Sequence, residues 1–164
     1  MSTMRALRKI APGPGLTLAD VPVPELGPRD VRIRVHYAGI CGTDKHIYDW
    51  DAWAESRVPT PLTIGHEFVG TVEALGSAVG TVALGQRVSG EGHLIGMKSR
   101  MARAGHFHLD PETMGVGVNV PGAFAEYLKI PAFNAIHLPP EVDDDIGFVI
   151  ARGVGVKRVR HHCQ

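Results

Sequence analysis

Pro61-Leu-Thr-Ile-Gly-His-Glu-Phe-Val-Gly-Thr-Val-Glu-Ala-Leu75 combines a strand pattern with residue types that bind metals. From Phe68 to Leu75 the stretch is rich in β-branched and apolar residues. Glycines at positions 76 and 80 follow it, which indicates a strand that ends in a turn. Just before the strand, His66 and Glu67 offer an imidazole and a carboxylate, two common zinc-ligand types. The stretch therefore predicts a strand with a candidate metal site at its start.

Short strands also account for much of the remaining chain. Val31–Val35 alternates apolar and charged residues, and Ala123–Ile130 alternates again before a proline. Residues 85–90 read as a turn and a short strand, whereas residues 41–57 and 94–114 lack a strand period and indicate loops or short helices. Many short strands at such spacing favour a mainly β fold with short helices, either a barrel or a sandwich.

Charge balance and cysteine content exclude several classes of protein. The chain has 164 residues, with 17 basic and 17 acidic side chains, so nucleic acid and anionic membranes are not expected as partners. Its two cysteines, Cys41 and Cys163, do not form the framework of a secreted disulfide scaffold. The sequence has no apolar run near the roughly 20 residues that span a bilayer, and no signal-peptide core. We therefore expect a cytoplasmic protein.

A second group of ligand types lies upstream, in Ala38-Gly-Ile-Cys-Gly-Thr-Asp-Lys-His46. A cysteine by itself is commonly a small buried hydrophobe, and a single histidine is more often a core or surface residue than a ligand. Cys41 and His66 carry more weight together. A catalytic zinc uses three protein ligands of these types and keeps one position for water or substrate.

The two groups together resemble a known enzyme family. Zinc-dependent medium-chain alcohol dehydrogenases carry a Cys-Gly-Thr/Ser-Asp motif and then a Gly-His-Glu-x-x-Gly motif, in the order found here. Three further segments are similar to the threonine dehydrogenases of that family, namely Ser89–His93, Gly115–Asn119 and Pro131–Ala135. Residues 48–53, Tyr-Asp-Trp-Asp-Ala-Trp, point the same way, and the resemblance covers about residues 4–148.

This resemblance implies a fold and a metal site. The expected fold is a GroES-like β-barrel over residues 1–150, the catalytic domain of these dehydrogenases. Cys41 and His66 are then the ligands of the catalytic zinc. Glu67 is a further ligand or a carboxylate close to the metal.

The resemblance also implies a path for the proton of the alcohol. Thr43 and His46 match the family's proton relay, in which a hydroxyl near the reacting oxygen passes a proton outward. A hydroxyl both donates and accepts, and histidine titrates near neutral pH. His93 matches a position near the substrate, and the alternative interpretation is a surface-loop histidine.

One departure from the family concerns a second, structural zinc, which its members often hold with four cysteines spaced Cys-x2-Cys-x2-Cys-x7-Cys. An ungapped alignment puts other residues at these positions, namely Gly96, Ser99, Ala102 and Asp110. We therefore expect this zinc site to be lost and one zinc at most per chain. His106 and His108 with Asp110 would form a replacement site if alternate residues of a strand shared a face; solvated histidines are the plainer interpretation.

A larger departure concerns NAD, because the family continues into a Rossmann domain with a Gly-x-Gly-x-x-Gly turn. The nearest string here, Gly153-Val-Gly155, lacks the third glycine and a preceding strand. We therefore expect NAD to serve the complete enzyme, with no Rossmann domain and no NAD site in this chain. Residues 151–164 are basic and without period, which predicts a disordered tail; a reading-frame or cloning accident is the alternative.

The predicted function is that of a zinc-dependent, NAD-linked alcohol dehydrogenase catalytic domain of threonine 3-dehydrogenase type, which oxidises a secondary alcohol to a ketone. Its partner would be a small-molecule alcohol, and the surface that would meet a nucleotide-binding domain would favour self-association. Without residues that hold NAD, the chain is expected to be inactive alone. Two alternatives stay open: a non-catalytic zinc-binding remnant and a GroES-like interaction module.

Overall fold

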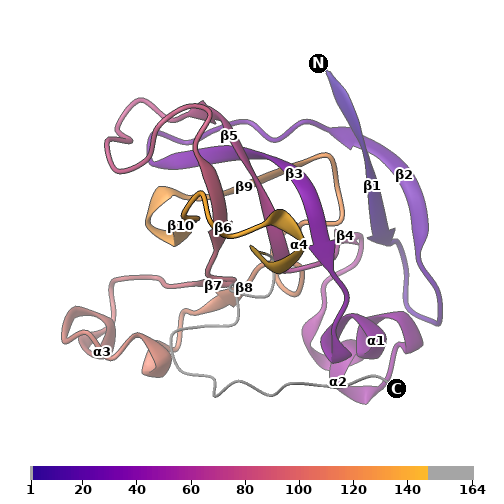
Figure 1. The fold of residues 1–164 in the computed structure, drawn as a ribbon. Helices are drawn as coiled ribbons and strands as arrows, with labels where there is room; N and C mark the ends of the chain where they lie inside the picture. The colour runs from indigo at the N-terminus through magenta and orange to yellow at the C-terminus, as the bar shows by residue number, and fades with distance from the viewer. Residues whose placement is uncertain (1, 148–164) are drawn as a thin grey trace.

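A five-stranded antiparallel sheet forms the centre of the molecule (Figure 1). The computed structural model describes residues 2–147, so the predicted tail at 151–164 lies outside the described residues. The strand order in the sheet is β10-β6-β5-β3-β9. The strands are β3 (Asp30–Gly39), β5 (Glu67–Leu75), β6 (Arg87–Gly90), β9 (Tyr127–Pro131) and β10 (Ala135–His137).

The main core lies against one face of this sheet. In β3, Val31 and Ile33 are fully buried, whereas Arg32 lies on the other face and pairs with Glu73 of β5 at 2.8 Å. This alternation is the one predicted for a half-buried strand. The buried cluster comprises Val31, Ile33, Phe68, Val72, Val88, Val116, Ala123, Leu128 and Ile130.

A three-stranded sheet of order β2-β1-β4 lies beside the first (Figure 1). Its strands are β1 (Thr3–Lys9), β2 (Thr17–Pro22) and β4 (Leu62–Thr63). Met4 and Ala6 of β1 pack with Val21 of β2 in a small core of their own.

The predicted strand at Ala123–Ile130 begins later than expected, at Tyr127 in β9. Upstream of β9, Phe124 donates its backbone N–H to Ile64 O at 2.9 Å and accepts from the N–H of Leu7 at 2.8 Å. These residues therefore connect the two sheets instead of extending one of them. Burial alternates only in β9, whereas Phe124 and Ala125 before it are both half-buried, so the alternating sequence pattern predicted a longer strand than the one that forms.

Two short helices follow β3, in the segment of residues 41–57 for which the sequence predicts either loops or short helices. They are α1 (Gly42–Asp49) and α2 (Ala52–Arg57), and Trp50 between them has a left-handed φ of 58°. Both helices pack on a second core cluster made of Ile47, Ala54, Val58, Leu62 and Ile64. This cluster fixes the position of α1, whose first turn carries the candidate site.

A lobe of little regular structure extends from the sheet between residues 93 and 115 (Figure 1). It contains β7 (His93–Leu94), α3 (Arg100–Arg103), η1 (Phe107–Leu109) and β8 (Met114–Gly115). The remaining elements are η2 (Ala132–Asn134), before β10, and α4 (Asp144–Gly147), which contacts β3 and β5.

Lys9, at the end of β1, is buried with 1% of its surface exposed. Its ammonium donates to the carbonyl oxygens of Gly13, Gly15 and Tyr48, and it lies 5.0 Å from the ring centroid of Trp50. All three ammonium protons thus have an acceptor. Burial lowers the pKa of Lys9 against an opposing effect from Asp49. Lys9 therefore ties the loop after β1 to the carboxyl end of α1.

The fold agrees with the predicted class. It is mainly β with short helices, and the five-stranded sheet curls into a half-barrel (Figure 1). Within residues 2–147, the structure contains no helix of the length and apolar character that crossing a membrane requires.

Candidate metal site and its pocket

Cys41 lies between the end of β3 and the start of α1, as the N-cap residue of the helix. Its sulfur accepts the backbone N–H of Thr43 at 3.3 Å. Asp44 Oδ2 accepts the backbone N–H of Cys41 at 2.9 Å, which completes a capping box. The two bonds fix the direction of the thiol at the start of α1.

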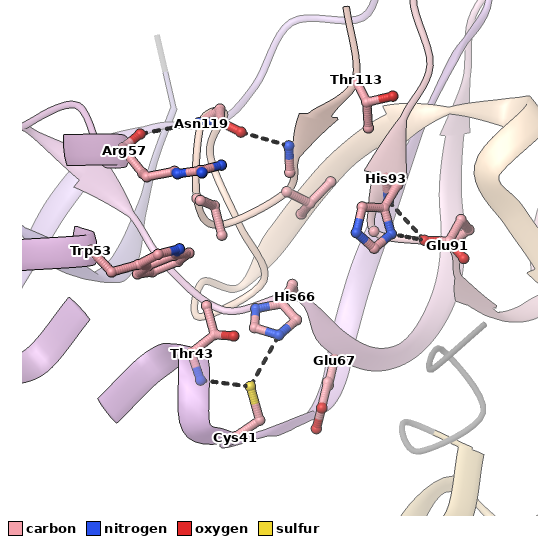
Figure 2. Close-up of a pocket in the computed structure, with 14 residues that line it drawn as sticks. Cys41, Thr43, Trp53, Arg57, His66, Glu67, Glu91, His93, Thr113 and Asn119 are labelled. Atoms are coloured by element: carbon pink, nitrogen blue, oxygen red, sulfur yellow. Dashed lines mark hydrogen bonds and ion pairs between the residues drawn. The ribbon is translucent and has the colours of Figure 1, made fainter. Parts of the chain in front are cut away.

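His66 immediately precedes β5, and its ring faces the thiol of Cys41 (Figure 2). The Nε2 and Sγ atoms lie 3.1 Å apart. Gly65 before it has a φ of +91°, and a Cβ there would lie 2.3 Å from the Phe124 ring. Only glycine fits this conformation and this space, so Gly65 is what allows the chain to present His66 to Cys41.

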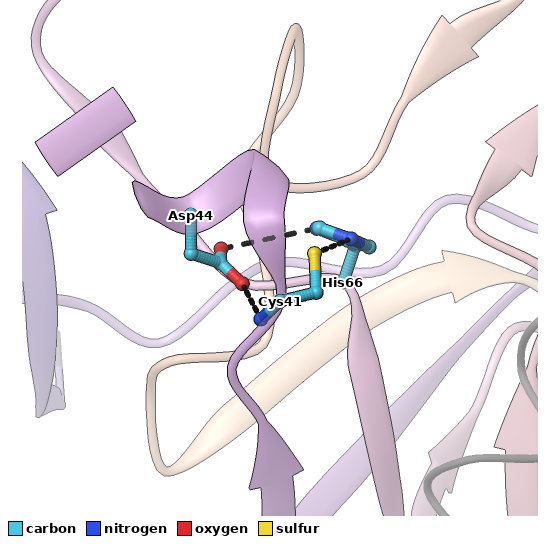
Figure 3. A group of neighbouring side chains, drawn as sticks. All are labelled: Cys41, Asp44 and His66. Atoms are coloured by element: carbon cyan, nitrogen blue, oxygen red, sulfur yellow. Dashed lines mark hydrogen bonds and ion pairs between the residues drawn. The ribbon is translucent and has the colours of Figure 1, made fainter. Parts of the chain in front are cut away.

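Asp44 completes the group from the first turn of α1, to the left of His66 in Figure 3, where a dashed line joins its carboxylate to the ring. It is 3% exposed, and its Oδ1 lies 3.9 Å from His66 Nδ1. Within residues 2–147, these two buried atoms have no hydrogen-bond partner. One ligand atom from each of Cys41, Asp44 and His66 lies within 4.8 Å of the other two.

The sequence predicts Glu67 as a further ligand or a nearby carboxylate, and that role stays a prediction; the group of three ligand-type side chains in the structure contains Asp44. Glu67 follows His66, is 8% exposed and lines the same pocket. Asp44 stands in the Cys-Gly-Thr-Asp motif, and the spacing of a cysteine N-cap and an acid three residues later is the signal that could have singled it out.

Thr43 and His46 both belong to α1, but they differ in their position relative to the cavity. Thr43 lines the pocket, whereas His46 lies outside the lining, with its ring centroid 5.9 Å from that of Trp53, which does line it. His46 Nδ1 lies 2.5 Å from Asp51 Oδ2. Asp51 also accepts the Ala54 N–H as N-cap of α2, and this bond together with His46 lowers the pKa of the carboxyl.

His93 begins β7 on the far side of the pocket in Figure 2. Its side chain is 75% exposed, and Glu91 Oε1 lies 2.6 Å from its Nδ1 and accepts its backbone N–H at 2.9 Å. The exposed ring is thus held by one carboxylate.

One cavity of about 660 Å³ brings the predicted residues together, with the exception of His46. Cys41, Thr43, His66, Glu67 and His93 all line it. The sequence did not predict the other polar and aromatic lining residues, which are Trp53, Arg57, Glu91, Thr113 and Asn119. Trp53, Glu91 and Asn119 lie in segments that resemble the threonine dehydrogenases, but the resemblance implied no role for any of the five, because they come from separate elements that the fold brings together.

The lobe is organised by Asp110, the last of the four residues at which the resemblance implied a lost structural zinc site. Asp110 is 5% exposed and accepts the backbone N–H of Gly96 at 2.8 Å and of Glu112 at 3.3 Å. Burial raises its pKa, but the hydrogen bonds from Ser99 and from the backbone at Glu112, Gly96 and Met97 outweigh that effect and lower the pKa.

His106 and His108 do not form a group with Asp110 among residues 2–147. They flank or lie in η1, a 3₁₀ helix, and their rings meet edge to face at a centroid distance of 6.3 Å. The replacement metal site required a strand, in which alternate residues share a face. A helix with three residues per turn does not provide that arrangement.

Residues 27–140 match the alcohol dehydrogenase GroES-like domain. That range covers most of the chain, and the curled sheet with Cys41 after β3 and His66 before the neighbouring β5 is in accord with it. The chain therefore belongs to the alcohol dehydrogenase GroES-like domain family.

Among curated relatives, the chain is 56% identical over 147 residues to an L-threonine 3-dehydrogenase of Ruegeria pomeroyi, and 53% identical over 146 residues to one of Mesorhizobium japonicum. These alignments cover 90% and 89% of this chain, but 43% and 42% of the relatives. The chain thus spans less than half the length of the curated relatives it matches.

Solved structures agree with the fold. An alcohol dehydrogenase from Escherichia coli CFT073, complexed with NADH, matches with a TM-score of 0.81 and 31% identity, over 92% of this chain and 42% of that one. A thermostable alcohol dehydrogenase from Pyrobaculum aerophilum, with cobalt and zinc bound, matches with a TM-score of 0.80 and 29% identity, over 92% of this chain and 45% of that one.

Proposed function

We propose that this chain is the zinc-binding catalytic domain of an NAD-linked alcohol dehydrogenase that oxidises the β-hydroxyl of L-threonine. The observation that carries the proposal is the contact between Cys41 Sγ and His66 Nε2 at 3.1 Å. Thiolate and imidazole are preferred zinc ligands, and both face one cavity. The relatives named L-threonine 3-dehydrogenase supply the substrate.

The donor set fits zinc. His66 Nδ1 lies toward Asp44 Oδ1 at 3.9 Å, so Nε2 on the side of Cys41 is the nitrogen left for a metal. Histidine ligands generally have a carboxylate or carbonyl at their other nitrogen, which fixes the tautomer. We assign Cys41 and His66 as ligands, with Glu67 as a third ligand or a nearby carboxylate. Zinc, when bound, acts as a Lewis acid that polarises the alcohol and favours loss of its proton.

The residues of α1 provide a path for that proton. Thr43 lines the cavity, and its hydroxyl accepts a proton while donating its own. His46 lies on the same helix with its side chain 57% exposed, and Asp51 holds its Nδ1. We propose that Thr43 receives the proton and that His46 carries it toward solvent. His93 shapes the opposite wall around the substrate.

Hydride transfer also needs an acceptor, which we propose to be NAD. Its binding residues lie outside residues 2–147, in accord with the length of the relatives. We further propose that the 164-residue chain alone does not transfer hydride. Without placement of the acceptor, a reaction forfeits up to about 7–11 kcal/mol of effective concentration. NADH formation from L-threonine by the purified chain tests this: turnover near one per second that Cys41→Ala abolishes would contradict it.

The metal site is tested by elemental analysis. The purified chain should hold one zinc, Cys41→Ala should remove it, and Cys163→Ala, at the other cysteine of the sequence, should leave it in place. Two tightly bound zincs per chain, or an unchanged zinc content in Cys41→Ala, would contradict the proposal.

We also propose a cytoplasmic location and self-association of the chain. Apolar side chains at the surface support the second point, since Ile40 beside Cys41 is 82% exposed and Tyr37 is 54% exposed. Sedimentation velocity over a range of concentrations tests it, and a monomer throughout that range would contradict it.

A further inference from the structure

Arg57 lines the cavity but belongs neither to the metal site nor to the proton path. It ends α2, one helical turn after Trp53, and residues four apart share a helix face. Ala54, on another face of α2, is fully buried in the core. The helix therefore presents Trp53 and Arg57 together to the cavity. Figure 2 shows the guanidinium extending toward the interior, above the indole.

The backbone of Arg57 is held in place by a neighbouring loop. Asn119 donates its side-chain amide to the carbonyl oxygen of Arg57 at 3.1 Å and accepts the N–H of Gly115 at 2.8 Å. The loop that contains Asn119 lines the same cavity. The end of α2 is thus fixed to the cavity wall, and the guanidinium starts from a defined point.

Arg57 also differs in charge from the other residues that line the cavity. It is the only lysine or arginine among the described residues that line the cavity. Within residues 2–147, its guanidinium makes no ion pair and no hydrogen bond. The carboxylate of Glu91 lies on the opposite side of the view, where His93 engages it (Figure 2). An approaching zwitterion therefore meets one cationic side chain, Arg57, and two carboxylates, Glu67 and Glu91, in the cavity lining.

We propose that Arg57 binds the carboxylate of a β-hydroxy-α-amino acid substrate. The proposal rests on the proposed function, which places the hydroxyl of the substrate at Cys41 and His66. A guanidinium is always charged and presents a planar fork of donors that matches a carboxylate. In such a substrate, the carbons that carry the hydroxyl and the carboxylate are adjacent, so both groups fit within one cavity of about 660 Å³. Arg57 is thereby a specificity-determining residue against neutral secondary alcohols.

The test compares two ligands that differ only in this group. Dissociation constants of the full 164-residue chain, loaded with zinc, are measured by calorimetry for L-threonine and for L-threoninamide, in which an amide replaces the carboxylate. We expect L-threonine to bind at least about tenfold more tightly, the size of a charged hydrogen-bonded pair. Arg57→Met should reduce this ratio to about one, and Arg57→Lys, which keeps the charge but not the fork, should restore part of it.

Arg103→Met is the matched control, because Arg103 also ends a short helix and is exposed, but lies in the lobe. It should keep the wild-type ratio. A wild-type ratio near one, or a ratio that Arg57→Met leaves unchanged, would overturn the inference. Arg57→Lys keeps the test valid if the methionine variant fails to fold.

The same samples separate this inference from the proposed function. Repeating the titration with Cys41→Ala asks whether the preference for the carboxylate survives loss of the metal ligand. A chain that holds one zinc but shows no preference contradicts the inference alone. A chain that discriminates through Arg57 but binds no zinc contradicts the metal site alone.

Discussion

Asp44 and Asp110 are both buried aspartates that accept backbone N–H groups, yet the regions around them differ. In the lobe, both oxygens of Asp110 have donors. At the candidate metal site, Asp44 has a donor for one oxygen, while its Oδ1 and His66 Nδ1 face each other at 3.9 Å and have no hydrogen-bond partner in the described part of the chain. A buried polar atom without a hydrogen bond lowers the stability of the fold, whereas one that is hydrogen-bonded helps to hold its surroundings in place. Asp110 thus serves the lobe alone, whereas Asp44 is directed at the histidine of the candidate metal site.

The largest expected difference between the regions concerns zinc. Asp44→Ala should weaken zinc binding by about 10–100-fold, because the carboxylate at His66 Nδ1 orients the ring for the metal. Competition with a chelator measures the dissociation constant. Asp110→Ala is the control and should leave it within about twofold. Equal weakening by the two variants would remove the distinction between the regions.

Removing Asp110 should open the lobe without disturbing the sheet. Asp110→Ala leaves the N–H groups of Gly96 and Glu112 without their acceptor, so these amides should exchange with solvent at least about tenfold faster. Hydrogen exchange followed by NMR gives this rate. Amides of β5 are the internal control, and faster exchange there as well would mean that the lobe and the sheet unfold together.

Acid should produce a milder form of the same opening. The folded pKa of Asp110 lies below its ordinary value of 3.8, so the stability it contributes is present above that value and is lost as pH falls through the lower folded pKa. Protonation weakens these hydrogen bonds, so exchange in the lobe, taken relative to amides of β5 at the same pH, should rise as the pH falls below 3.8. In Asp110→Asn, exchange in the lobe should no longer depend on pH in this range. A pH profile that this variant leaves unchanged would contradict the attribution of the effect to Asp110.

The smallest effect is expected at Ser99. Its hydroxyl accepts the N–H of Ala102 at 3.0 Å as N-cap of α3 and also bonds to Asp110. Ser99→Ala should destabilise the lobe by about 1 kcal/mol, or about fivefold in local opening. The exchange rate of the Ala102 amide measures this local opening. Ser56→Ala, at an exposed position of α2, is the control and should leave that rate unchanged. Zinc binding should not change in either variant.

Sequence alone predicts the local parts of this molecule. The alternation of apolar and charged residues at Val31 and Ile33 predicts their strand, and both side chains are buried. The motifs at Cys41 and His66 predict that these two residues lie together, and their Sγ and Nε2 atoms are 3.1 Å apart. The motif alone predicts no role for Asp44, because its importance depends on the direction of the His66 ring. The roles of Thr43, His46, Glu67 and His93 stay predictions.

The parts that sequence did not predict depend on contacts between distant segments. A lysine at position 9 reads as a surface residue, since nothing local shows that carbonyls of Gly13, Gly15 and Tyr48 converge on it. Arg57 likewise looks like an ordinary helix end until the loop of Asn119 is placed beside it. Period and motif describe neighbours in sequence, and these sites are made by neighbours in space.

The burial of Lys9 makes its amine a reporter of the candidate site. Amine-reactive reagents need an accessible, neutral amine; Lys45, whose side chain is 74% exposed, meets the first condition, whereas Lys9 is 1% exposed and donates to three carbonyls. Acylation of Lys9 therefore requires both the loop after β1 and the carboxyl end of α1 to release its ammonium. Since Cys41 caps the other end of that helix, labelling of Lys9 reports that one end of the helix that carries the thiol has come free of β1.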